Sequence, residues 1–124
     1  MSAPTEPAFD WAQASSLLGD DPNVVDPDMA SIARELVDGA EVQFAELKAK
    51  NADADRKGIS SLAHALRGCL LNFGFTEVGT ILMDIEKGPP YTDAEFHEKL
   101  ERAYTTFLAS KKMLAERYPA VGIS

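Results

Sequence analysis

The stretch ISSLAHALRGCLLNFG, residues 59–74, decides the fold that the sequence predicts. Its apolar residues recur at intervals of three and four, which places them on one side of an α-helix at about 100° per residue. They are Ile59, Leu62, Ala63, Leu66, Leu70 and Phe73. Gly74 is typical of a residue that ends a helix. We therefore expect a helix that begins near Ile59, or as early as Asp53, and ends at Phe73.

His64 lies on the other side of this helix, about 140° from the centre of the apolar stripe, so we expect its imidazole to be exposed. Gly68, one turn further on, opens space beside the ring. Arg67 is a permanent cation within reach of that space, and its planar guanidinium suits phosphate oxygens. Ser60 and Leu71 share this side, and the apolar Leu71 indicates a docking surface.

Helix signals also mark most of the remaining chain, and the sequence lacks the alternating β-branched runs that predict strands. Caps and helix-ending residues predict further helices over about residues 10–18, 27–50, 76–86 and 92–118. The second of these carries an apolar stripe of Met29, Ile32, Ala33, Leu36, Ala40, Phe44 and Leu47. We therefore predict an all-α fold, an antiparallel four-helix bundle with an additional short N-terminal helix.

Length and composition indicate one globular domain, because the chain has 124 residues, of which 45% are apolar and 26% charged. We expect this domain to span residues 1–124, with residues 1–8 as a flexible tail. The formal net charge of −8 and the scattered Lys and Arg residues argue against nucleic acid as a partner.

The single cysteine, Cys69, cannot form an internal disulfide. No segment has the features of a signal peptide or of a membrane span. We therefore expect a cytoplasmic protein that does not bind membranes. Since no second apolar stripe is evident, we also expect a monomer.

The motif AHALRG at residues 63–68, with Gly74 ten residues after His64, resembles the signature of histidine-phosphotransfer (HPt) domains. The pair Ile85-Glu86 after the next apolar stripe also fits that family. The resemblance implies that His64 is a phosphoacceptor, which takes a phosphoryl group from the aspartate of one receiver domain and passes it to another. It also implies that Arg67 offsets the phosphoryl charge and that Gly68 gives access to the ring.

The resemblance further implies the partners of the chain, which are receiver domains of response regulators and of hybrid sensor kinases in two-component phosphorelays. Mg²⁺ and the acidic pocket that drive the transfer would belong to the receiver, so we expect no cofactor or metal in this chain and little catalysis of its own. The family commonly has small residues where this chain has Cys69 and Leu70. Leu70 belongs to the buried stripe, and we expect Cys69 to be a small core residue at its edge.

Two alternatives remain open beside the phosphocarrier. The chain could be an adaptor that binds receivers or kinases without being phosphorylated, although the presence of both His64 and Arg67 argues against it. A metal-dependent helical enzyme would need Glu three residues before a histidine, and Ser61 and Ala94 occupy those positions.

Three residues outside the motif have simpler interpretations. His97 is expected to pair with Glu101 on an exposed helix face. Trp11 and Val37 could extend the docking surface near His64, but core or boundary positions are the simpler expectation for both.

Overall fold

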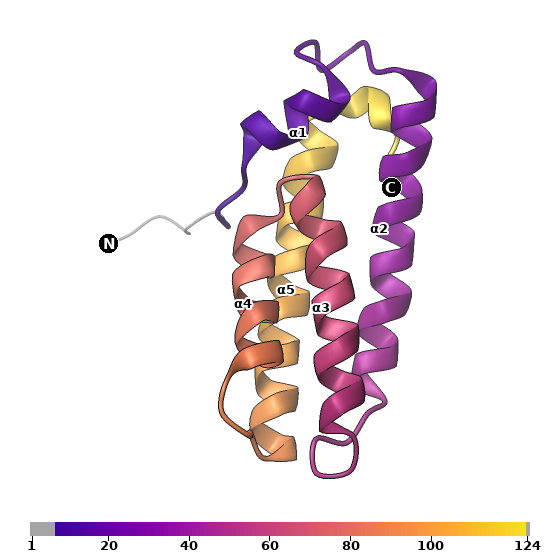
Figure 1. Ribbon diagram of the computed structural model, residues 1–124. Helices are drawn as coiled ribbons and strands as arrows, with labels where there is room; N and C mark the ends of the chain where they lie inside the picture. The colour runs from indigo at the N-terminus through magenta and orange to yellow at the C-terminus, as the bar shows by residue number, and fades with distance from the viewer. Residues whose placement is uncertain (1–6, 124) are drawn as a thin grey trace, which may run out of the picture.

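The computed structural model describes residues 7–123, and this part of the chain is helical with no strand. Figure 1 shows the longer helices alongside one another and the short N-terminal helix across one end. In chain order these are α1 (Trp11–Leu18), α2 (Pro27–Lys48), α3 (Arg56–Asn72), α4 (Thr76–Lys87) and α5 (Asp93–Arg117), followed by the 3₁₀ helix η1 (Pro119–Val121). The prediction of an all-α fold is confirmed.

Short polar side chains set where most of the helices begin. The carboxylates of Asp10, Asp26 and Asp55 accept hydrogen bonds from backbone N–H groups in the first turns of α1, α2 and α3. Thr92 and Glu95 form the predicted capping box at the start of α5. The cap at Asp55 explains why α3 begins at Arg56, between the two starting points that the sequence allowed.

The helices pack as a closed ring around one core, because α3 contacts α2 and α4, and α5 contacts α4 and α2. Phe44, Phe75 and Phe107 are buried in this core. The ring of Phe107 packs against the rings of both Phe44 and Phe75. The predicted stripe of α3 is buried at Ile59, Ala63, Leu66, Leu70 and Phe73, and Leu62 is half-buried. No described helix is both long and apolar enough to cross a membrane.

The stripe predicted for α2 is partly wrong. Val37 is buried, whereas Ile32 is 47% exposed. The buried face consists of Ala30, Ala33, Val37, Ala40, Phe44 and Leu47. Because Leu36 and Val37 are both apolar, the sequence is compatible with two rotations of this helix about its axis. Packing against α3 and α5 selects the rotation that buries Val37. A buried Val37 cannot extend a docking surface.

Cys69 is exposed, so the prediction that it is a small core residue is wrong. It lies at the edge of the α3 stripe, about 80° from its centre, and the neighbouring helices do not cover that side. Trp11 is half-buried at the end of the bundle, where it packs against Phe9 and lies 5.0 Å below the guanidinium of Arg117. It therefore belongs to the end of the core.

The chain before α1 is attached to the turn between α3 and α4. The Asp10 N–H donates to the Gly74 carbonyl at 2.8 Å, and the Glu77 N–H and Thr76 hydroxyl donate to the Ala8 carbonyl. Of the expected tail at residues 1–8, residues 1–6 lie outside the described residues. Gly74 has φ +94°, and a Cβ on it would collide with the Asp10 carbonyl oxygen. This turn therefore requires glycine.

Replacing Gly74 by Ala should destabilise the protein by about 1–3 kcal/mol, because the new side chain meets both positive φ and a backbone clash. Denaturant unfolding followed by helical circular dichroism measures this change. Gly39→Ala is the matched control, since a Cβ there meets nothing within 4 Å and α2 gains helix propensity. Equal stability of the two variants would contradict the account of the turn.

His97 joins the end of α2 to the start of α5. Its Nε2 lies 3.0 Å from the Lys48 carbonyl, and its Nδ1 lies 2.9 Å from the Asp93 carbonyl and 3.3 Å from the Asp93 carboxylate. Both ring nitrogens face acceptors, so the protonated ring satisfies all of them. These contacts, the Lys48 carbonyl first, raise the pKa of His97 above its ordinary 6.5. The prediction that His97 pairs with Glu101 was wrong, because helical side chains lean toward the N-terminus and bring the ring to Asp93, one turn earlier.

A raised pKa in the folded state means that protonated His97 stabilises the fold. This contribution is fully present below the unfolded pKa of 6.5 and is lost as the pH rises through the raised folded value. The melting temperature of the wild type should therefore fall between about pH 6 and pH 8.5 more than that of His97→Gln. Parallel melting profiles of the two proteins would show that His97 does not act in this way.

Candidate functional site

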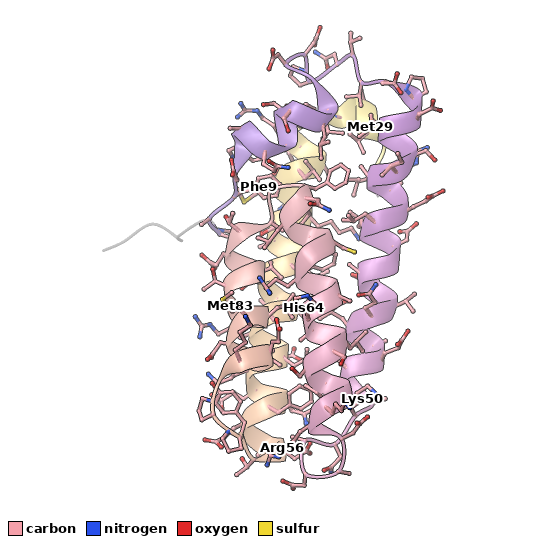
Figure 2. All side chains as sticks on the ribbon, viewed as in Figure 1. Phe9, Met29, Lys50, Arg56, His64 and Met83 are labelled. Atoms are coloured by element: carbon pink, nitrogen blue, oxygen red, sulfur yellow. The ribbon has the colours of Figure 1, made fainter. Side chains whose placement is uncertain are left out.

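His64 lies on α3 on the face that Figure 2 shows toward the viewer. Its side chain is 64% exposed, and the prediction that the imidazole is accessible is confirmed. The apolar residues on the other side of α3 hold the helix in the core, so the exposure of His64 follows from the helical period. The ring is therefore available to another molecule without any movement of the fold.

Glu86, at the end of α4, contacts both His64 and Arg67. Its Oε2 lies 2.9 Å from His64 Nδ1, and its Oε1 accepts from Arg67 Nε at 3.3 Å and Nη2 at 3.2 Å. The side chains of Glu86 and Arg67 are only 10% and 15% exposed. The guanidinium therefore fixes the direction of the carboxylate toward the ring.

This contact determines which nitrogen of His64 is free. A carboxylate oxygen only accepts hydrogen bonds, so Nδ1 must carry the proton that it shares with Glu86. Arg67 Nη2 also lies 3.3 Å from Nδ1. This short distance is not a hydrogen bond, because a protonated Nδ1 cannot accept one. The two groups are close because both bind the Glu86 carboxylate. The lone pair of the neutral ring is then on Nε2, for which the described residues supply no hydrogen-bond partner. Nε2 is therefore the ring atom whose lone pair can act as a nucleophile.

The other predicted site residues lie on the same face of α3 as His64. Ser60 is half-buried, and its hydroxyl donates to the Glu86 carbonyl at 3.2 Å, which attaches the end of α4 to α3. Gly68 is exposed, and a Cβ on it would meet nothing within 4 Å. Leu71 is half-buried, because its side chain packs against Gly79 on α4. A Cβ added to Gly79 would lie only 2.6 Å from Leu71 Cδ2, so this contact needs glycine.

Two residues of this face were missed as site residues. Glu86 appeared in the sequence as part of a motif, but its contact with His64 depends on the register between α3 and α4. Met83 is 42% exposed on α4, on the same side of the molecule as His64 in Figure 2. An apolar residue on the side of α4 away from its buried stripe was the sequence signal that could have identified Met83. Within residues 7–123, no group of three or more His, Cys, Asp or Glu residues could hold a metal ion.

Replacing Glu86 by Ala should change the tautomer of neutral His64. Without the carboxylate, Arg67 can donate to Nδ1, and the proton moves to Nε2. Nitrogen chemical shifts of the imidazole, measured by NMR at a pH where the ring is neutral, distinguish the two tautomers. We expect the Nδ1–H form in the wild type and mainly the Nε2–H form in the variant. An Nε2–H wild type would contradict the role given to Glu86.

Comparison with known proteins supports the sequence signature independently. The family model of the Hpt domain matches residues 28–110, a range that runs from α2 into α5 and includes the whole His64 site. No curated protein and no solved structure matches the chain significantly. The family match covers well over half of the 124 residues. The chain therefore belongs to the histidine-phosphotransfer (Hpt) domain family, whose members act in two-component phosphorelays.

Proposed function

We propose that this protein is a phosphocarrier that relays a phosphoryl group between the aspartates of receiver domains through Nε2 of His64. The observation that carries the proposal is the pairing of an exposed imidazole with a carboxylate on its Nδ1. Such a ring offers a lone pair to an incoming phosphorus atom and needs no base to activate it.

The transfer balances without any proton movement. The Nε2 lone pair attacks the phosphorus of an aspartyl phosphate, the N–P bond forms, and the P–O bond to the aspartate breaks and leaves a free carboxylate. The product is a phosphorylated imidazolium that still carries its proton on Nδ1. Glu86, 2.9 Å from Nδ1, faces the positive charge that develops on the ring. The reverse sequence delivers the phosphoryl group to a second receiver.

Arg67 and Gly68 support this step in different ways. The charge of Arg67 offsets the phosphoryl charge, and its hydrogen bonds to Glu86 hold the carboxylate in place. Gly68 leaves open space one turn from the ring, where a side chain would meet the incoming receiver. Ser60 and Leu71 on α3 and the exposed Met83 on α4 serve as docking residues on the same face of the molecule as the ring, the last two apolar.

The remaining parts of the proposal concern the partner and the setting. Receivers of response regulators and hybrid sensor kinases dock at His64 and bring Mg²⁺ and most of the catalysis. We propose a cytoplasmic monomer with one domain over residues 1–124 and no nucleic-acid or membrane partner. The fold is an antiparallel four-helix bundle with α1 at one end, which the short connections and the course of the ribbon in Figure 1 support.

Phosphoryl transfer from a panel of phosphorylated receiver domains tests the proposal directly. The wild type should take up acid-labile, base-stable label, and His64→Gln should take up none, because the nucleophile is gone. The matched control is His97→Gln, which removes the other histidine and should be labelled like the wild type. Receiver binding without label on the wild type would contradict the phosphocarrier function and favour an adaptor.

A further inference from the structure

The helix that carries His64 is basic although the chain is acidic. α3 contains Arg56, Lys57 and Arg67 and no Asp or Glu, while the whole chain has a net charge of −8. Arg67 is committed to Glu86, and Arg56 lies 3.8 Å from Asp53. Lys57 is exposed and has no ion pair among residues 7–123. The free positive charge of this face is therefore concentrated at the start of α3.

Lys57 lies on the same side of α3 as His64, because seven residues are close to two helical turns. The separation along the axis is about 10.5 Å at 1.5 Å per residue. A protein interface of ordinary size covers roughly 800 Å² on each partner, which is a footprint about 16 Å in radius. A partner centred on His64 therefore reaches the start of α3, where Figure 2 labels Arg56.

A pocket of about 330 Å³ opens beside Lys57, between the start of α3 and the end of α4. The apolar part of its lining includes Ile59, Ile85 and Phe96, all buried in the core. Arg56 and Lys57 also line it. Ser60 and Glu86 belong both to this pocket and to the His64 site, so the two are continuous.

The wall of the pocket opposite α3 is held in place by a polar network. The hydroxyl of Tyr91 donates to Asp84 at 2.7 Å, and the Lys99 ammonium lies 2.9 Å from the same carboxylate and 4.8 Å from the Tyr91 ring centre. The adjoining wall residues, Pro89 and Pro90, have restricted backbones. Because the pocket is already formed, a ligand need not order its wall on binding.

We propose that this pocket is a second docking subsite for the receiver domain that exchanges phosphate with His64. It takes an apolar side chain of the receiver, while acidic side chains beside that anchor pair with Lys57 and Arg56. The inference rests on the proposed function. A receiver fits in charge, because the carboxylates that hold Mg²⁺ around its aspartate make the face that docks on His64 negative, and that face extends over Lys57. Opposite charges at the rim chiefly raise the rate of association.

The test measures the affinity and initial transfer rate for a receiver that labels the wild type. Lys57→Glu should raise Kd about tenfold at low salt and by much less at high salt, since the contact is exposed. The matched control is Lys112→Glu, which makes the same charge change at an exposed position near the other end of the bundle. It should change Kd less than about twofold if the effect is local.

The apolar part of the subsite has its own pair of variants. Pro90→Asp adds a negative charge to the pocket wall and should weaken receiver binding, whereas Ala109→Asp adds one at an exposed position of α5 and should not. Circular dichroism confirms that all four variants stay folded. If the wild type is labelled on His64 but both test variants bind the receiver as tightly as their controls, this inference is overturned and the phosphocarrier function still stands. A wild type that neither binds nor accepts label from any receiver would overturn both.

Discussion

The contact between the Glu86 carboxylate and His64 Nδ1 is the interaction on which the proposed phosphotransfer depends. It requires a charged carboxylate that is mostly shielded from water, and Arg67 supplies the compensating charge. With Nδ1 committed, the neutral ring has one free lone pair, on Nε2, and the side chain is 64% exposed. The same carboxylate then faces the positive ring that phosphorylation creates. In the proposed transfer, one fixed acceptor thus selects the nucleophile and stabilises the product.

The fold makes this contact possible by fixing the register of α3 against α4. Ser60 bonds the Glu86 carbonyl, Leu71 packs where Gly79 leaves room, and Gly74 makes the turn that joins the two helices. A slip of one residue on either helix would rotate its site residue by about 100° and separate the carboxylate from the ring. The packing that buries the core is therefore also what positions the site.

Much of this could be predicted from the sequence, because the information is local. Caps such as Asp26 and Thr92 act within one helical turn, and the stripe of α3 determines that His64 faces solvent. Contacts between helices could not be predicted, since they depend on rotation and register. For that reason the rotation of α2 was ambiguous at Val37, and Glu86 was not identified as the partner of His64. The Lys48 carbonyl at His97 was missed for the same cause.

The central claim is that phosphate is carried on Nε2 of His64 because Glu86 occupies Nδ1. The most direct test is NMR of the phosphorylated protein with nitrogen-15 in its histidines, in which coupling to phosphorus identifies the nitrogen that bears the phosphoryl group. We predict phosphorus coupled to Nε2 of His64, with the proton retained on Nδ1. Phosphorus on Nδ1, or on another residue, would contradict the account.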